Sequence, residues 1–592
     1  MVSPLVWVAA GIVAYTLGAM ALKARGKIPE SVRVSGPITT LHTIRGRDFL
    51  DRLAAPKRFW RAWGNFGVGI ALVVMVGAFL AVLTAAVSAL GQTERSPVQD
   101  PQNVLVIPGV NDFLPLSAAP EILFGLLVGL VVHEGGHGLL CRVEEIDIDS
   151  MGLALFAFIP IGAFVEPDEE SRLKASRGSQ TRMFAAGVTN NFFVAFVGFL
   201  LLFGPVAGSI SAAQGVPIGN VAEGGTAADA GLEYGDVITE VEGQPVANVS
   251  EMSAELDRVR ERQVDVTLRG GETATLERRL LLSRSVASVA GGLSPSPENT
   301  IGVETVNGSA VYTERQFAAA MDDRLFATIG TDEGTATFPV GAYGLAAEGG
   351  ALTSEGAPTN TDVIVTRLDG ERTPNETVYS QVLGGLEAGS TVETVAYVDG
   401  ERTTYDVTVG GGDGGDALGL RTQPGYSGVT VVELGVNIYP AETFLAYLGG
   451  NNGLLGGLLS GEFVVLVFQS IYLPFFSALP TGSAFGFAGF LSPVTNFYAV
   501  SGPLSAIGAG GVFTAANVLF WSAWVNLNLG LFNCVPTFPL DGGHILRASA
   551  ESFVARLPVD DGRRLTSAVT ASVSLVMITG LFLMIFGPGL LN

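Results

Sequence analysis

The sequence predicts a polytopic α-helical membrane protein with β-rich extracytoplasmic domains inserted between two membrane regions. Of the 592 residues, 48% are hydrophobic, and a mean hydropathy of +0.43 is too apolar for a soluble chain of this length. Long apolar stretches gather towards both ends, whereas the acidic residues behind a formal net charge of −23 gather between about residues 213 and 435. The expected regions are therefore 1–212 (membrane), 213–290 and 291–435 (β-rich), and 436–592 (membrane).

The N-terminal membrane region contains four apolar stretches long enough to cross a bilayer. The expected spans are Pro4–Leu22, Trp63–Leu90, Pro120–Cys141 and Met183–Ile210. Lys and Arg gather in Lys23–Arg61 and Arg142–Arg182, so the positive-inside rule places both loops in the cytoplasm and Gly91–Ala119 outside. Within the second basic loop, Met151–Val165 is too apolar for a plain loop and indicates a hairpin or re-entrant segment. His42, in the first basic loop, is expected at the surface.

The acidic middle region alternates short β-type runs with Gly-containing turns. Gly225–Val246 is the clearest unit, and Asp362–Gly400 repeats its pattern. Asn307-Gly308 belongs to a third, weaker repeat of this strand-and-turn pattern, within a stretch whose assignment stays open. We expect two related β-rich modules. Their acidic surface disfavours nucleic-acid partners and suits a halophilic source.

The C-terminal membrane region begins with two apolar stretches, Leu454–Ala478 and Gly486–Ile507, in a part of the chain interrupted by prolines. They should cross the bilayer an even number of times or be re-entrant. The clear spans that follow are Val512–Cys534 and Leu565–Phe586. The arginines between them indicate a cytoplasmic loop.

The motif that carries chemistry lies at the end of the third span, where His133, Glu134 and His137 form H-E-x-x-H. Residues i and i+4 of a helix share one face, so both imidazoles can bind one metal ion while Glu134 serves as a base. Zinc is expected because imidazole binds it well. Ionisable residues in an apolar span are expensive and usually functional. Cys141 could be a further ligand, although a packed thiol fits its apolar surroundings better.

A third ligand is expected from Asp541, in P-L-D-G at the cytoplasmic end of a later span. The topology places it at the same membrane depth as the two histidines, and two His with one carboxylate form a normal catalytic zinc set. His544, three residues further on, competes for this role. Neither cysteine of the chain, Cys141 or Cys534, indicates a disulfide framework.

The two motifs together resemble the site-2 protease family of intramembrane zinc metalloproteases. The resemblance rests on His133–His137 (H-E-G-G-H) and Asn533–Gly542 (N-C-V-P-T-F-P-L-D-G). Phe158–Glu166 and Ala185–Phe192 are similar to the branch that includes the sterol-regulatory site-2 protease, and Gly225–Val246 resembles a PDZ domain.

This resemblance implies regulated intramembrane proteolysis: hydrolysis of peptide bonds within or near membrane-spanning segments, with one zinc ion per chain. Glu134 would be the general base, and Asn191 and Asn533 would position the substrate or support the site. Both asparagines could instead be interhelical hydrogen-bond donors. The expected substrates are single-span membrane proteins trimmed beforehand by another protease. The PDZ modules would act as a filter or bind a new C-terminus, with Gly215–Gly219 as candidate carboxylate-binding loop.

Two other functions stay open at this point: an inactive zinc-binding membrane scaffold with PDZ partner-binding modules, and a proton or metal transporter. A transporter is expected to place polar residues along several spans, whereas here they gather at one depth. The predicted location is the cell membrane, with many passes, the active site near the cytoplasmic face and the PDZ region outside.

Overall fold

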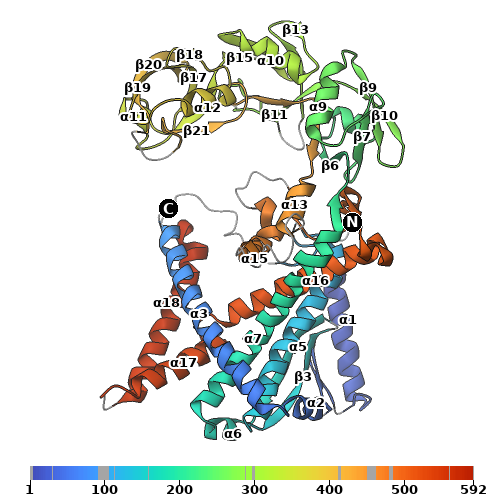
Figure 1. Cartoon of the computed structure of the whole chain (residues 1–592), viewed down its shortest axis with the longest axis vertical. Helices are drawn as coiled ribbons and strands as arrows, with labels where there is room; N and C mark the ends of the chain where they lie inside the picture. Colours follow the sequence, from blue (N-terminus) through green and yellow to red (C-terminus); the bar gives the residue numbers. More distant parts are fainter. Residues whose placement is uncertain are drawn as a thin grey trace. The chain divides into compact units, whose positions relative to one another are not determined.

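The computed structural model comprises residues 1–592 and describes all of them except 1–3, 30, 44, 91–105, 112–113, 158, 287, 296–299, 411–414, 450–461, 479–484, 559–560 and 591–592. The chain divides into two compact units (Figure 1). The helical unit contains Met1–Ser211, Glu442–Leu491 and Tyr498–Asn592, and the β-rich unit contains Ala212–Ala441 and Ser492–Phe497.

The helical unit is built from long apolar helices. Its α-helices are α1 (Pro4–Ala24), α2 (Arg45–Leu53), α3 (Lys57–Leu90), α5 (Ala119–Val143), α6 (Glu169–Lys174), α7 (Arg177–Leu201), α15 (Glu462–Tyr472), α16 (Gly508–Asn533), α17 (Asp541–Val554) and α18 (Gly562–Leu590), with α13 (Ala441–Tyr447) at the boundary between the units. Five described stretches are long and apolar enough to cross a membrane: Lys57–Ala89, Leu116–Val143, Arg177–Ser209, Pro503–Asn533 and Gly562–Phe586. The predicted class of a multi-helix membrane protein is therefore supported.

The predicted spans around residues 454–507 are not long helices in the described residues. Glu462–Ser477 is a shorter apolar helix. The described residues from 485 to 507 contain the short 3-10 helices η6 (Val494–Phe497) and η7 (Pro503–Ile507) and one strand, Tyr498–Val500. At the N-terminus, α1 (Pro4–Ala24) covers the predicted span Pro4–Leu22. The beginning of Leu454–Ala478 and most of the predicted external loop Gly91–Ala119 lie outside the described residues.

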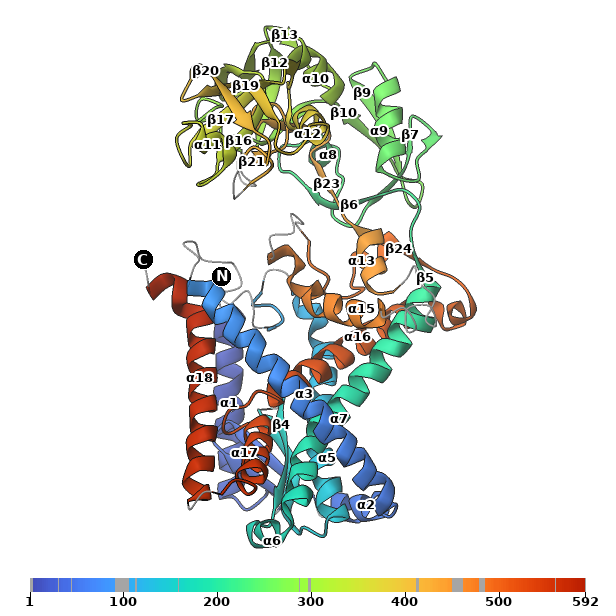
Figure 2. The ribbon, with the colours of Figure 1, turned by 60° about the vertical axis from the view of Figure 1, so that its left-hand side comes forward.

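Three helices, α5, α7 and α16, pack against one another and form the centre of the helical unit. Small residues allow this close approach: a Cβ on Gly125 of α5 would lie 2.8 Å from the Trp521 carbonyl oxygen of α16, and one on Gly198 of α7 would lie 2.9 Å from Ala523 Cβ. Such contacts are typical of helix packing in membranes. α18 packs against the C-terminal part of α3, and the two helices diverge from there (Figure 2). Side chains such as Val73 stay exposed on the outside, as expected for a lipid-facing surface.

A four-stranded antiparallel sheet lies beside α5 in the helical unit, with the order β1-β2-β3-β4. Its strands are β1 (Val32–Ser35), β2 (Ile38–His42), β3 (Ile148–Phe156) and β4 (Ile159–Pro167). β3 and β4 form the hairpin expected for Met151–Val165. The hairpin continues a sheet begun by residues more than 100 positions earlier, because β2 pairs with β3. Two further short strands, β5 (Ile210–Ala212) and β24 (Tyr498–Val500), form a two-stranded sheet.

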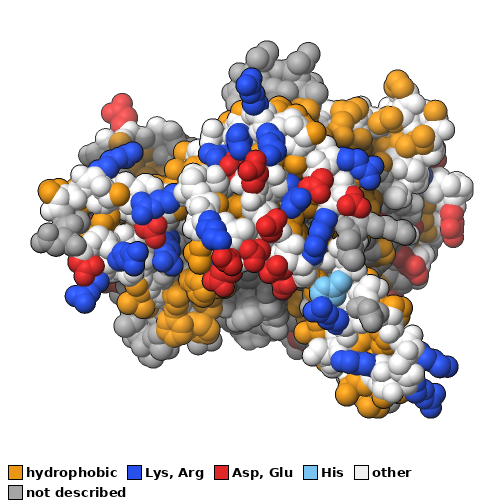
Figure 3. All heavy atoms as spheres, turned by 90° about the horizontal axis from the view of Figure 1, so that it is seen from below, with side chains coloured by type: hydrophobic (Ala, Val, Ile, Leu, Met, Phe, Trp, Pro, Cys, Tyr) orange, Lys and Arg blue, Asp and Glu red, His pale blue; other side chains and the backbone are white. Residues whose placement is uncertain are grey.

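The end of the helical unit that carries α2 and α6 is strongly charged. Figure 3, viewed from this end, shows basic and acidic side chains mixed over the surface. The pairs there include Lys57–Glu145 at 2.9 Å and Lys174–Glu170 at 2.6 Å. The apolar helices thus end in a hydrated, ion-paired surface.

The β-rich unit contains three six-stranded sheets of the same pattern. The first contains β6 (Val216–Val221), β7 (Val237–Val241), β8 (Gln244–Pro245), β9 (Gln263–Leu268), β10 (Thr273–Glu277) and β23 (Val436–Ile438), with α8 (Thr226–Asp229) and α9 (Val249–Arg258). The second contains β11 (Leu280–Arg284), β12 (Ile301–Val306), β13 (Ser309–Ala310), β14 (Phe326–Thr331), β15 (Gly334–Pro339) and β22 (Thr430–Val432), with α10 (Glu314–Asp322). The third contains β16 (Ala342–Ala346), β17 (Asp362–Leu368), β18 (Glu371–Arg372), β19 (Thr391–Val398), β20 (Glu401–Thr408) and β21 (Leu420–Gln423), with α11 (Ala351–Ser354) and α12 (Glu376–Gly384).

The three sheets are nested. The returning segment from β21 to β23 supplies one strand to the third, the second and the first sheet in turn. Each sheet has its own apolar core and the same tight turn with two left-handed residues, at Glu242-Gly243, Asn307-Gly308 and Asp369-Gly370. Such a turn joins adjacent antiparallel strands.

This arrangement corrects the expectation of two modules. The weaker repeat at Asn307-Gly308 is the turn of a complete second sheet. The expected boundary at residue 290 falls inside that sheet, after β11. The expected carboxylate-binding loop Gly215–Gly219 is mostly strand β6, which pairs with β7 on one side and β23 on the other. Its backbone groups are therefore engaged by neighbouring strands and do not form an open loop.

Candidate active site

The centre of the candidate site is a convergence of three side chains from two helices. His133 and His137 lie one turn apart on α5, are buried, and hold their Nε2 atoms 3.2 Å apart. Asp541, the first residue of α17, places Oδ2 3.1 Å from His133 Nε2 and 3.3 Å from His137 Nε2. Residues separated by about 400 positions thus meet at one point.

The spacing of these atoms fits a metal ion. Tetrahedral zinc with bonds of about 2.0–2.2 Å holds its ligand atoms roughly 3.3–3.5 Å apart, close to the 3.1–3.3 Å found here. Asp541 Oδ2 and His133 Nδ1 are buried without a hydrogen-bond partner among the described residues. Buried polar atoms normally have a partner. A divalent cation bound between the two imidazoles would supply the missing partner of the Asp541 carboxylate oxygen.

The protonation of the site also suits metal binding. His137 Nδ1 lies 2.8 Å from the carbonyl oxygen of Met183, which can only accept, so Nδ1 carries the proton and Nε2 keeps its lone pair for a metal. A metal ion bound by both imidazoles would also hold Asp541 as a carboxylate, the form that a metal ligand takes.

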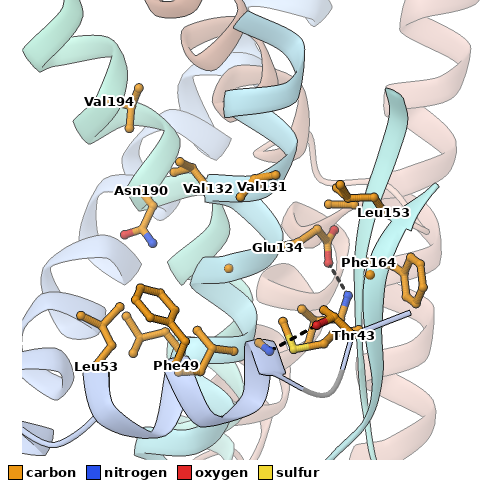
Figure 4. A pocket seen from close by; sticks show the side chains of 18 of the residues that line it. Thr43, Phe49, Leu53, Val131, Val132, Glu134, Leu153, Phe164, Asn190 and Val194 are labelled. Atoms are coloured by element: carbon orange, nitrogen blue, oxygen red, sulfur yellow. Dashed lines mark hydrogen bonds between the residues drawn. The ribbon is translucent and has the colours of Figure 1, made fainter. Parts of the chain in front are cut away.

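Glu134 lies beside these ligands; its carboxylate and the two imidazoles form a group of possible ligand atoms within 4.8 Å of one another. Its Oε2 accepts a hydrogen bond of 3.0 Å from the backbone N–H of Val165 in β4 (Figure 4). The hairpin thereby fixes one carboxylate oxygen, while Oε1 can accept a proton.

Glycine is required where α7 passes the histidines. A Cβ on Gly187 would lie 2.7 Å from His137 Nε2 and 2.9 Å from His133 Cε1. Any side chain at this position would displace the imidazoles, so the absence of Cβ is part of the site.

Two alternative ligands weighed from the sequence lie elsewhere. The His544 ring stacks on Phe184 with centroids 4.3 Å apart, and burial lowers the pKa of His544. Cys141 is fully buried in the apolar core beneath α5, as a packed thiol.

The two expected asparagines make backbone contacts. One terminal atom of the fully buried Asn191 amide lies 3.3 Å from the carbonyl oxygens of both Gly187 and Gly129, so it is the NH₂ group and joins α7 to α5. Asn533 donates to the carbonyl of Leu529 in its own helix, at 3.0 Å. These contacts favour the interhelical hydrogen-bonding alternative for Asn191.

Next to Glu134 lies a largely apolar cavity of about 780 Å³. Its walls come from α2, α3, α5, α7 and the sheet; Figure 4 shows Glu134 and Asn190 from two helices on its lining, with Phe49, Leu53 and Phe164 around them. His42, expected at the surface, lines this cavity and packs its ring edge-on against Phe164 at 5.1 Å. The correction has a topological cause, since β2 joins the hairpin, which a local reading of a basic loop does not reveal.

A comparison with protein families matches residues 121–578 to the family described as Peptidase family M50. The chain belongs to peptidase family M50. The matched stretch contains both metal-site segments, which confirms the resemblance to the site-2 protease family drawn from the motifs. Together with the five apolar helices, membership of M50 supports a membrane-embedded metalloprotease in general terms.

Among curated proteins, the chain is similar to an uncharacterized protein of Methanocaldococcus jannaschii, MJ0971, with 25% identity over 211 residues. The aligned part is 36% of this chain and about half (53%) of that relative.

Proposed function

We propose that this M50 peptidase is an intramembrane zinc metalloprotease that hydrolyses peptide bonds within or near membrane-spanning segments. The observation that carries the proposal is the meeting of His133, His137 and Asp541 beside Glu134 on the wall of an apolar cavity. Those three residues would hold the zinc ion, which when bound polarises a peptide carbonyl and acidifies water.

The protein's own groups supply the proton transfers. Glu134, held through one oxygen by the Val165 N–H, takes a proton from the attacking water and passes it to the leaving amine. The apolar walls of the cavity accept apolar side chains of the substrate and exclude bulk water. A helix hides its carbonyls in backbone hydrogen bonds, so the substrate segment has to unwind before cleavage.

Placement in the membrane follows from charge. The basic stretches Lys23–Arg61 and Arg142–Arg182 favour a cytoplasmic position for the end that carries the site. The three nested sheets would then lie outside the cytoplasm as PDZ-like modules that filter or recruit single-span substrates, already trimmed by another protease.

The decisive experiment compares cleavage of a co-expressed single-span reporter by the wild type and by Glu134→Gln, with zinc measured in both purified proteins. The expected result is a loss of cleavage of at least about 100-fold with zinc retained. Equal cleavage by both proteins would refute a Glu134-dependent protease. No cleavage by either protein, with zinc bound, would favour the scaffold instead.

A further inference from the structure

The cavity beside Glu134 has a second polar group, on α7. Asn190 is half-buried and lines the same cavity as Glu134 and Gly135. Figure 4 shows its amide on the α7 side of the space, with Glu134 on the side of the hairpin. The two groups are thus presented to one occupant from two different elements.

The orientation of this amide is fixed by Trp63 of α3. The indole Nε1–H donates to Asn190 Oδ1 at 2.9 Å, and because an indole nitrogen can only donate, the amide oxygen faces Trp63. The Trp63 ring is itself held edge-on against Phe193, with centroids 5.4 Å apart. The tryptophan therefore acts as a rigid support for one end of the amide.

The other end of the amide is left as an unused donor. Asn190 Nδ2 lies against the backbone of Gly136, 2.8 Å from where a Cβ of that residue would be. Among the described residues, Nδ2 has no hydrogen-bond acceptor. An amide with its acceptor engaged and its donors free, on a mainly apolar wall, is suited to an occupant that brings an acceptor.

The neighbouring asparagine, Asn191, cannot offer a donor to an occupant of the cavity. Asn191, the next residue along α7, is rotated by about 100° about the helix axis and is fully buried. Its amide donates to the carbonyl oxygens of Gly187 and Gly129. It has no donor left for an occupant, whereas Asn190 has.

We propose that Asn190 is a substrate-positioning residue whose NH₂ group donates to a backbone carbonyl of the unwound, apolar peptide segment in the cavity, with Trp63 holding the amide in the donating orientation. The proposal rests on the proposed function for the nature of the occupant. An unwound segment in an apolar cavity carries carbonyls that have lost their helical partners, and a fixed donor recovers one of these bonds.

The test uses the full-length protein in detergent with a fluorogenic peptide from a membrane-spanning segment. Asn190→Ala is expected to raise KM on the order of tenfold with little change in kcat and with zinc content unchanged. Trp63→Phe, which keeps the ring and removes the N–H, should shift KM in the same direction by a smaller factor. Because Trp63 acts through Asn190, the double variant should be no worse than Asn190→Ala alone. Asn528→Ala, an asparagine that donates within its own helix, is the matched control.

An unchanged KM in Asn190→Ala, loss of zinc together with activity, or additive effects of the two substitutions would each overturn the proposal. If Asn190→Ala does not fold, Trp63→Phe decides by the same criteria. Binding of the same peptide to the Glu134→Gln protein separates this proposal from the protease itself. Tenfold weaker binding after adding Asn190→Ala supports the positioning role even if no hydrolysis is found, and equal binding refutes it even if hydrolysis is confirmed.

Discussion

Replacement of Gly187 by alanine should disrupt the metal centre while the helical unit stays folded. The added Cβ would lie 2.7 Å from His137 Nε2, whereas ordinary contact begins at 3.4 Å, so the ring has to withdraw by roughly 0.7 Å. Metal sites tolerate deviations of only about 0.2 Å in ligand distances. We expect zinc affinity to fall by roughly 10- to 100-fold or more, the range for replacing a supporting residue of a metal site, and proteolysis to fall with it.

The helical unit should nevertheless stay folded. Alanine in a helix is favoured over glycine by about 0.5–1 kcal/mol, which offsets part of the roughly 1–3 kcal/mol that crowding the buried rings costs, so the metal-free variant should melt close to metal-free wild type. Zinc affinity is measured by chelator competition and the fold by helical circular dichroism on heating. Gly69→Ala in α3 is the matched control, because nothing lies within 4 Å of its added Cβ. Wild-type zinc affinity in Gly187→Ala would refute the reasoning, as would a loss of zinc explained by a lower melting temperature.

Two further predictions follow from the same contacts. Asp541→Ala should release zinc on dialysis while His544→Ala retains it, because only Asp541 places an oxygen within 3.3 Å of both imidazoles; zinc retained in Asp541→Ala contradicts the assignment. Arg278 and Glu433 form an ion pair with side chains only 1% and 9% exposed, so Arg278→Ala should destabilise the β-rich unit by about 3–5 kcal/mol by leaving a buried charge unpaired, measured by hydrogen exchange of its strands. Arg262→Ala breaks an exposed pair, 62% and 65% exposed, and should cost less than about 1 kcal/mol; equal effects would exclude burial as the cause.

Two of the three residues of the candidate metal site, His133 and His137, could be predicted to lie together because their spacing is a local feature of the sequence. Residues i and i+4 of a helix share a face wherever the helix lies, so His133 and His137 needed no knowledge of the fold. The position of charged loops then placed Asp541 at the same depth. The resemblance to a known family rested on these same two segments, and the family match spans both.

The cavity walls were not predictable in this way. Which of Asn190 and Asn191 faces the cavity depends on the rotation of α7 about its axis, and the apolar residues of α7 do not gather on one face, so the sequence gives no amphipathic signal for that rotation. The place of His42 on the cavity wall was missed for a related reason: strand β2 pairs with β3 across more than 100 residues, and such pairing leaves no local signal in the sequence. The nested sheets are a third case, since the 19 residues from β21 to β23 close three sheets whose other strands are all upstream.

The division of the chain limits how the β-rich unit can influence catalysis. His133, Glu134, His137 and Asp541 all belong to the helical unit, as do the residues that line the apolar cavity. The three side chains that meet there come from α5 and α17. Substitutions in the three sheets are therefore expected to leave zinc affinity and the turnover of a short peptide unchanged. If the β-rich unit acts as the proposed filter, the same substitutions should change the cleavage of large membrane substrates, and a changed zinc affinity would refute this division of roles.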